Sequence, residues 1–392
     1  MNQHHKGLLK IGDIHLAPFE NFPDISIKID DVHIYEEKAA EHPILDVKDI
    51  YLGFNLWDIL SGNYDLHSLL VEDGFFNIVI HVDGSTNLAN ALAAPDDVEE
   101  EDDPLHIHLQ RIELRNLDIH KLNESNMMDI ETYIHQADGG FKTNDQEIAM
   151  HIDSRFELNV MDNGDTTFIK HKHFEFHTDL ILNQKTGRMS IAPSGVVMEH
   201  GDFEIQGDVD TKNDMDMNLK VKGTKPNFDM LIAFAPEDII PILEQYRNAG
   251  KIYFNSTIKG PTTGNNMPLI QAEFGASEAF MENTDKNRLL DDMGFKGHFS
   301  NGALRDLTTM EFSMTDIRAK PEKGKITGSV IVKNFVEPDV DMSFQADFDL
   351  NFVAEFLNLD DLDDAEGLVH LEMKFHDIID LENPEHALKD LN

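Results

Sequence analysis

The chain has 392 residues, 41% of them hydrophobic, which is enough for a folded protein with a core and argues against global disorder. Its 32 basic and 74 acidic side chains give a formal net charge of −42, which argues against binding nucleic acid or docking on anionic headgroups through a basic patch. Without cysteine the chain has neither disulfides nor thiol catalysis.

Apolar and polar residues alternate along most of the chain. Ile25, Ile27 and Ile29 alternate with polar residues near the start, and Leu105, Ile107 and Leu109 do the same further on. A period of two is typical of antiparallel strands with one dry and one solvated face. Turn sequences separate such runs at Asp83-Gly84, Asn163-Gly164, Gln184–Gly187 and Gly201-Asp202. The sequence therefore predicts a mainly β fold built as a long, twisted antiparallel sheet.

A few short helices are expected between the strands. Asn55 is a suitable N-cap for the segment LWDIL, and Gly62 can end that helix. Asp349 can cap a second helix, over LNFVAEFL. Further short helices are expected over 86–93 and 228–234, and Pro236 and Pro241 are expected to break the segment after the latter.

An acidic run at residues 96–103, bracketed by Pro95 and Pro104, is expected to be a solvated loop. It lacks the glycine and the ligand spacing of an EF-hand loop. We therefore expect an N-terminal β segment with short helices over residues 1–95, an acidic loop over 96–104, and a continuing β region over 105–392.

Two stretches of the β region, about 214–259 and 339–376, have the same pattern of an alternating strand, a short apolar helix and another alternating strand. Their hydrophobic register matches position for position although their identity is low. Repeated modules of this kind predict an extended sheet with a continuous apolar face. The side chains expected to line the groove along that face are Ile25, Ile27, Ile29, Leu105, Ile107, Leu109, Met215, Met217, Leu219, Val221, Ile252, Phe254, Ile258, Val340, Met342 and Phe344.

The segment HKHFEFH, residues 171–177, is the strongest candidate for metal chemistry. In a strand, His171, His173, Glu175 and His177 point to one side. Successive residues on one side of a strand are roughly 6.6 Å apart, so all four cannot reach one ion. The remote candidate His171 and His173 would therefore need help from a neighbouring strand, and the alternative is an ordinary polar strand face.

No motif for catalysis is found. The serines lack a G-x-S-x-G context, and neither a phosphate loop nor a dinucleotide fingerprint occurs. With so many acids, paired carboxylates carry no information about general acid–base chemistry. We therefore expect a protein that is not an enzyme and uses no cofactor.

The sequence shows no signal peptide and no apolar run long enough to span a membrane. We expect either a cytoplasmic protein or one whose export segment lies outside the sequence given. The carboxyl end likewise suggests a piece of something longer.

Several segments in order resemble the AsmA family of bacterial envelope proteins, especially its Bacteroidetes form. The first is PFENFPDISIKIDDVHI from Pro18. The second is the stretch from Ile44, which holds Leu56–Gly62, Val71–Gly74 and Asp83–Asn87. The downstream segments are TKPNFDMLIAFAP, NSTIKGP, DMGFKGHFSNG, LTTMEFSM and FHDIIDLENPE. The resemblance covers essentially the whole chain, and none of these motifs is catalytic.

The resemblance implies a curved antiparallel sheet forming an apolar groove, similar to TamB and to bridge-like lipid-transfer proteins. It implies a place on the periplasmic side of the inner membrane, an anchor helix that is missing from this chain, and phospholipid acyl chains as cargo. Envelope protein partners are also possible under this resemblance.

Two main hypotheses follow, beside a distant third, an iron- or zinc-dependent enzyme built on the strand at residues 171–177. The first is a non-enzymatic lipid-binding or lipid-transfer module of the bacterial envelope, which carries acyl chains along the groove. The second is a β scaffold, adhesion or assembly protein whose apolar faces pack on each other and which carries no lipid. Periodicity alone does not separate a filled core from a lipid-filled groove.

Overall fold

The computed structural model describes residues 5–17, 24–62, 65–93, 109–162, 165–166, 169–235, 239–263, 266–359 and 366–379. It is mainly β, with 65% of the chain in strands and 8% in five short helices, so the predicted fold class is confirmed. The chain divides into two compact units, residues 1–199 (unit 1) and 200–392 (unit 2). In each unit the strands form an open sheet that is not closed into a barrel.

Unit 1 contains the first eleven strands. They are β1 (Leu8–Lys10), β2 (Ile14–Ala17), β3 (Asp24–Tyr35), β4 (Leu45–Asn55), β5 (Leu66–Ile80), β6 (Arg111–Asn123), β7 (Met128–Thr143), β8 (Glu147–Asp162), β9 (Asp165–Thr166), β10 (Lys172–Asn183) and β11 (Arg188–Met198). Strands β1 and β2 both pair with β3, after which the pairing runs β3–β4–β5–β6–β7–β8–β10–β11, while β9 pairs with β8.

One pair in unit 1 is parallel, which the prediction of an antiparallel sheet did not include. Strands β5 and β6 run in the same direction from Ser68↔Arg111 to Ile80↔Asn123. A parallel pair needs a long connection, and residues 81–110 supply it. This connection holds α2 (Asn87–Leu92), whose Asn87 binds the β5 backbone at Asn77 O and Val79 N. The acidic run 96–103 belongs to the same connection and lies outside the described residues.

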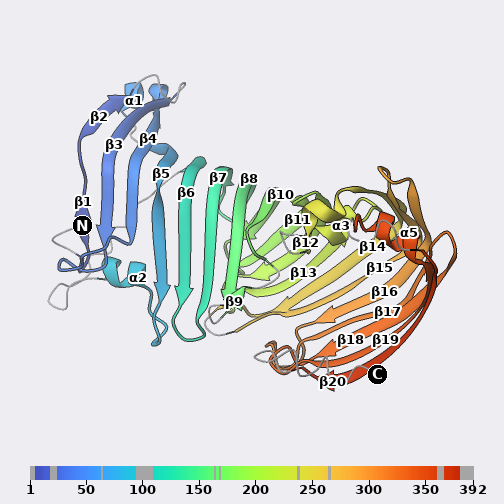
Figure 1. Cartoon of the computed structure of the whole chain (residues 1–392). Helices are drawn as coiled ribbons and strands as arrows, with labels where there is room; N and C mark the ends of the chain where they lie inside the picture. The colour runs from blue at the N-terminus through green and yellow to red at the C-terminus, as the bar shows by residue number, and fades with distance from the viewer. Residues whose placement is uncertain are drawn as a thin grey trace. The chain divides into compact units, whose positions relative to one another are not determined.

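Unit 2 is an antiparallel meander in which each strand pairs with its neighbours in the chain (Figure 1). Its strands are β12 (Gly201–Asp210), β13 (Asp216–Gly223), β14 (Tyr246–Gly260), β15 (Leu269–Asn283), β16 (Arg288–Ser300), β17 (Glu311–Lys320), β18 (Gly324–Lys333), β19 (Asp339–Asp349) and β20 (Leu368–Ile378). In Figure 1 the strands β15–β20 curve along their length.

The two similar stretches of the sequence occupy equivalent places in unit 2. The first forms β13, α3 (Asp229–Ile232), α4 (Ile240–Leu243) and β14, and the second forms β19, α5 (Leu350–Phe356) and β20. In each, the two strands pair with each other and the helical segment connects them. The helices of both stretches therefore lie at the same end of the meander.

The helix caps follow local sequence rules. The Asn55 side chain accepts from Trp57 N at the start of α1 (Leu56–Ser61), and Gly62 ends that helix with φ 86°. Asp349 accepts from Asn351 N at the start of α5. The expected break at Pro241 is wrong, because Pro241 lies in the first turn of α4, where its missing N–H costs nothing. Pro236 lies outside the described residues.

Residues of positive φ interrupt the strands of both units. In unit 2, Glu278, Asp292 and Asp316 have φ of 49°, 47° and 52° at bulges, because the register shifts beside each of them. In unit 1, Asp73 and Asn116 have φ of 56° and 50°, but the register between β5 and β6 does not shift there. Each such residue reverses the alternation of its strand, so the same face stays apolar on both sides of it.

The predicted turns have mixed outcomes. Gly84 and Gly187 have φ of 85° and 74°, as turns require. Gly201 and Asp202 do not form a turn but begin β12, and Glu199 has the positive φ, 52°, in the preceding residues. Asn163 and Gly164 lie outside the described residues.

Candidate functional site

The candidate site is one face of the unit 2 sheet, here called the apolar face. Residues directly opposite each other on paired strands share a face, so the register defines it across all nine strands. Its apolar members include Phe203, Ile205, Val209, Met217, Leu219, Val221, Ile252, Phe254, Ile258, Ile270, Ala272, Phe274, Ala276, Ala279, Met281, Leu290, Met293, Phe295, Phe299, Phe312, Met314, Ile317, Ala319, Ile326, Val330, Val332, Val340, Met342, Phe344, Ala346, Phe348, Val369, Leu371, Met373 and Phe375.

Charged side chains are confined to the ends of this face. Within the described strands of unit 2, Arg288 and Asp377 share it, at the first residue of β16 and the last-but-one of β20. The opposite face carries ion pairs such as Lys251 with Glu278 at 2.6 Å and Lys296 with Asp316 at 2.8 Å. The hydrogen bond from Lys296 holds the pKa of the Asp316 carboxyl below its usual range.

The apolar face is more deeply buried on β12–β14 than on β15–β20. On β12–β14 five of the nine members named above are buried, among them Val209 at 2% and Leu219 at 6% exposed, and the other four are half-buried. On β15–β20 most of the large side chains are only half-buried, and Leu371 is 43% exposed. Apart from Leu371 none of them is fully exposed, but partly exposed apolar side chains continue over six neighbouring strands, which is typical of a binding surface.

The segment around α3 and the helix α5 cover the apolar face at the end of the meander where they lie. Phe234, next to α3, stacks on Phe254 with centroids 5.1 Å apart, and Phe203 meets both rings edge-on. Tyr246, Phe352 and Phe356 form a buried cluster under α5. The apolar face is therefore closed at this end.

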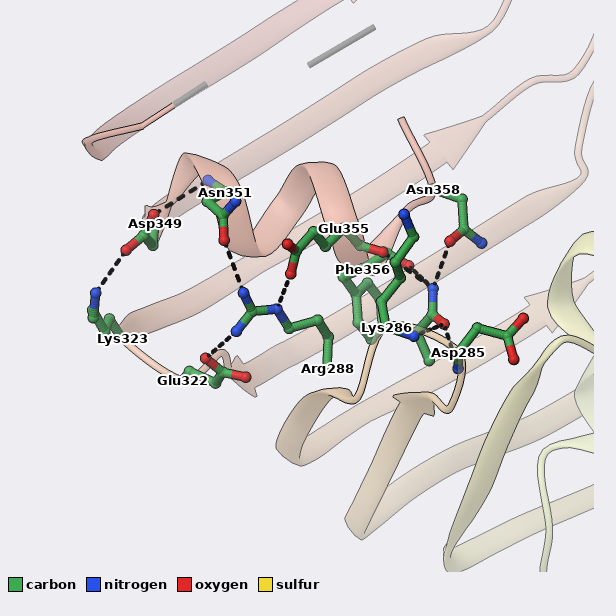
Figure 2. A network of polar contacts seen from close by, with 11 residues as sticks. Asp285, Lys286, Arg288, Glu322, Lys323, Asp349, Asn351, Glu355, Phe356 and Asn358 are labelled. Carbon is green, nitrogen blue, oxygen red and sulfur yellow. Dashed lines mark hydrogen bonds and ion pairs between the residues drawn. The ribbon is translucent and has the colours of Figure 1, made fainter. Parts of the chain in front are cut away.

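Polar contacts fix α5 in place, as Figure 2 shows. Arg288 forms an ion pair with Glu355 and donates to Asn351 Oδ1 at 2.8 Å, and it also meets Glu322 at 2.8 Å. These contacts lower the pKa of the Glu355 carboxyl, chiefly through the hydrogen bond from Arg288. Lys323 binds Asp349 at 2.8 Å at the start of the helix.

The last carbonyls of α5 are capped by side chains from the sheet. Asn283, which is 4% exposed, donates to Glu355 O and Phe356 O at 3.1 Å each and to Asn358 Oδ1 at 2.9 Å. Tyr246 Oη donates to Phe356 O at 2.8 Å. These bonds satisfy backbone groups that a buried helix end would otherwise leave without partners.

The structure brings together most of the site residues predicted in unit 2. Nine of the ten lie on the apolar face: Met217, Leu219, Val221, Ile252, Phe254, Ile258, Val340, Met342 and Phe344. Met215 does not, because it precedes β13 and has φ 50°, outside the extended region. The expectation that it continues the alternation is wrong.

The predicted residues of unit 1 have different outcomes. Ile25, Ile27 and Ile29 share a face of β3 with Phe54, Leu52 and Ile50 of β4. Leu109 lies just before β6, while Leu105 and Ile107 lie outside the described residues.

The remote metal candidates pair with carboxylates instead of with each other. His171 precedes β10 with φ 48°, so it does not share the strand alternation of His173. His171 Nδ1 lies 2.7 Å from Glu157, which also lies 3.8 Å from His173 Nε2, and His173 Nδ1 lies 3.3 Å from Glu199. One donor atom from each of His171, His173 and Glu157 cannot be found within 4.8 Å of the others, so their pairing as a chelate is not supported.

Residues on β15–β18, in the middle of the apolar face, were not predicted as site residues from the sequence. The signal was present, since Phe312 and Met314 alternate with polar residues, but the bulges interrupt the pattern and hide its continuity. Only the register shows that these strands carry the same face as the two repeats.

Comparisons with protein-family models, with curated proteins and with solved structures find no match for this chain. Among the described residues, no helix has both the length and the hydropathy to cross a bilayer.

Proposed function

We propose that this protein is a non-enzymatic lipid-binding or lipid-transfer module that holds acyl chains on the apolar face of unit 2. The observation that carries the proposal is the continuous, only half-buried part of that face on β15–β20, in a sheet that is not closed into a barrel. It favours lipid over the alternative of a lipid-free scaffold, whose apolar faces would be packed by the chain's own side chains.

The energetics support an apolar cargo. Burying one methylene gains about 0.8 kcal/mol, so a chain of sixteen carbons gains roughly 12 kcal/mol relative to water. A bilayer offers the same chain a similar gain, so exchange between bilayer and protein is close to neutral. Such exchange permits transfer without trapping and needs no catalytic residue.

The shape of the face also supports acyl chains. Gly328 of β18 lies opposite Phe344 of β19, and a Cβ at Gly328 would lie 2.5 Å from the Phe344 ring. The Phe344 ring therefore lies flat over Gly328 instead of standing perpendicular to the sheet. Rings in this orientation, together with alanines such as Ala346, leave a low surface on which a flexible chain can rest.

The resemblance to the AsmA family leads to the same proposal. Under it, the protein works on the periplasmic side of the bacterial inner membrane, in supply of phospholipid for the outer membrane. Lipid identity, anchor and envelope partners come from this resemblance alone, and the chemistry of the apolar face requires only acyl chains.

The test is lipid content measured on variants that place a charge on one face or the other. The protein is purified from cells and examined by native mass spectrometry and lipid extraction. Met217→Asp and Phe344→Asp place a carboxylate on the apolar face, while Asn218→Asp and Ser343→Asp place one on the opposite face one residue away. Circular dichroism and urea unfolding show which variants remain folded.

We expect co-purified phospholipid in the wild type and in the two opposite-face variants, and its loss in folded Met217→Asp and Phe344→Asp. A second assay follows transfer of a fluorescent phospholipid between vesicles. A folded wild type that holds no lipid and transfers none would favour the scaffold alternative and reject the proposal.

A further inference from the structure

Two histidines and two aspartates form a square on the polar face of unit 1. On β8 they are His151 and Asp153, and on β10 they are His177 and Asp179. The register places His151 opposite Asp179 and Asp153 opposite His177. The two strands thus present imidazole and carboxylate groups in alternation around one point.

The contacts within the square are short. His151 Nε2 lies 2.9 Å from Asp153 Oδ2, and His177 Nδ1 binds Asp153 Oδ1. The two imidazole rings meet edge-on with centroids 4.9 Å apart. One donor atom from each of these three residues lies within 4.8 Å of the others, and no other described group of three or more such side chains is this close.

These distances suit a transition-metal ion. Zinc bonds to histidine nitrogen and carboxylate oxygen at about 2.0–2.2 Å, which places tetrahedral donors roughly 3.4 Å apart. The donors now contact one another directly, so a bound ion would replace these contacts and move the donors apart. Two imidazoles and one carboxylate are also a donor set that prefers zinc over magnesium or calcium, whose ligands are oxygens.

The fourth residue of the square has the role of an orienting partner. Asp179 Oδ1 lies 2.7 Å from His151 Nδ1 and holds that nitrogen as the donor, which leaves Nε2 to face Asp153. A carboxylate on the far nitrogen of a liganding histidine is the usual arrangement around zinc, where it fixes the tautomer.

Space for the ion and a further ligand lies beside His177. The residue opposite His177 on β11 is Gly195, and a Cβ there would meet no atom within 4 Å. A shallow hollow of about 350 Å³ opens at this point, lined by His177, Asp153, Gly195 and the neighbouring Asp138, Arg155 and Glu175. Its three carboxylates outnumber the one guanidinium that lines it, Arg155, and this balance favours a cation.

We propose that His151, Asp153 and His177 form a zinc-binding site on unit 1, with Asp179 as the positioning residue and water in the open coordination position. The site is independent of the proposed lipid function, because it lies on the polar face and uses no residue of the apolar face. It also replaces the chelate of His171 and His173 considered from the sequence.

The test is zinc titration of the full chain after treatment with a chelator, by competition with a fluorescent zinc indicator and in excess magnesium. Magnesium occupies general acidic sites on this highly charged surface, so zinc that still binds is held by the histidines. We expect one equivalent to bind, and affinity to fall at least tenfold in His151→Gln and His177→Gln. Asp179→Asn is expected to cost about 10–100-fold.

His370→Gln is the matched control, since His370 is an exposed histidine that pairs across strands with a single carboxylate, Asp347, at 2.6 Å. It is expected to bind zinc as the wild type does. Cobalt(II) provides a second measurement, because a tetrahedral site gives visible absorption bands that His177→Gln removes.

Two results would overturn the site. One is a wild type that binds no zinc in excess magnesium. The other is unchanged affinity in His151→Gln and His177→Gln, with circular dichroism showing both folded, since the zinc would then be bound elsewhere.

Discussion

The ring of Phe274 on β15 occupies the space above Gly297 on β16. The two residues are directly opposite in the register, and a Cβ at Gly297 would lie 2.1 Å from Phe274 Cε2. The same ring stacks on Phe312 of β17 with centroids 6.0 Å apart. The glycine therefore lets an aromatic ring lie flat across two strands of the apolar face.

This relationship predicts that Gly297→Ala is destabilising even though alanine normally suits a strand better than glycine. The added methyl group must displace the Phe274 ring, and overpacking of this kind costs about 1–3 kcal/mol. Gly140→Ala is the control, because a Cβ at Gly140 on β7 meets nothing within 4 Å. It should be neutral or stabilise by about 0.5–1 kcal/mol. Urea unfolding measures both, and equal effects of the two substitutions would contradict the prediction.

A second prediction concerns the attachment of α5. Asn283→Ala removes the donor to Glu355 O, Phe356 O and Asn358 Oδ1, and leaving such buried acceptors without it costs about 1–3 kcal/mol. Amide hydrogen exchange should show faster opening of α5. Asn266→Ala, in which the side chain binds only a nearby turn carbonyl, should leave exchange in α5 unchanged.

A third prediction concerns the bulges. Asp292 and Asp316 have positive φ, which glycine adopts without steric cost. Asp292 lies 3.8 Å from Arg318, whereas Asp316 bonds Lys296 at 2.8 Å. Asp292→Gly should therefore raise the free energy of unfolding by up to about 1 kcal/mol. Asp316→Gly should gain less, since it also loses the closer ion pair. The reverse order, measured by urea unfolding, would show that backbone strain at these bulges is not the controlling factor.

A fourth prediction concerns acid. The pKa of Glu355 lies below its ordinary value of 4.5 because Arg288 donates a hydrogen bond to the carboxylate. A lowered folded-state pKa contributes stability that is full above 4.5 and is lost as the pH falls through the folded-state value. Glu355→Gln should therefore be less stable than the wild type near neutral pH, and the difference should shrink below 4.5.

The quantity to measure is the difference in unfolding free energy between the wild type and Glu355→Gln at each pH. With a formal charge of −42, protonation of many carboxylates also relieves repulsion over the whole chain, and this effect is common to both. A difference in unfolding free energy that stays constant from neutral to acid pH would show that the ion pair between Arg288 and Glu355 contributes no pH dependence.

The apolar face could be predicted in part because alternation fixes which residues share a side of a strand. Met217, Leu219 and Val221 could be assigned together from the sequence, and so could Met342 and Phe344. Their meeting on one face needed the register of the intervening strands β14–β18, which single-strand periodicity does not supply.

Residues of positive φ within strands left a signal that a simple search for alternation misses. In β5 the apolar positions change from the odd residues Leu69 and Val71 to the even residues Gly74 and Phe76, and Asp73, with φ 56°, lies at the change. A reversal of phase at an acidic residue within one strand therefore indicates a residue of positive φ there and not the end of the strand.

The parallel pair and the histidine cluster could not be derived from alternation. The pattern of β5 and β6 is the same whichever way the strands run, and only the length of residues 81–110 hinted at a crossover. His177 was recognised as a polar strand residue, but His151 and Asp153 lie 26 and 24 positions earlier in the chain, and only the pairing of β8 with β10 brings them beside it.

The meander of unit 2 has a consequence for how such a molecule can change in evolution. In the part of unit 2 that the structure describes, the strands hydrogen-bond to the strands before and after them, and a strand–helix–strand module occurs twice. Duplication or deletion of one hairpin would alter the width of the sheet by two strands and leave every other pairing intact. Gene rearrangement can thus change the width of the sheet in steps of two strands, without redesign of a core.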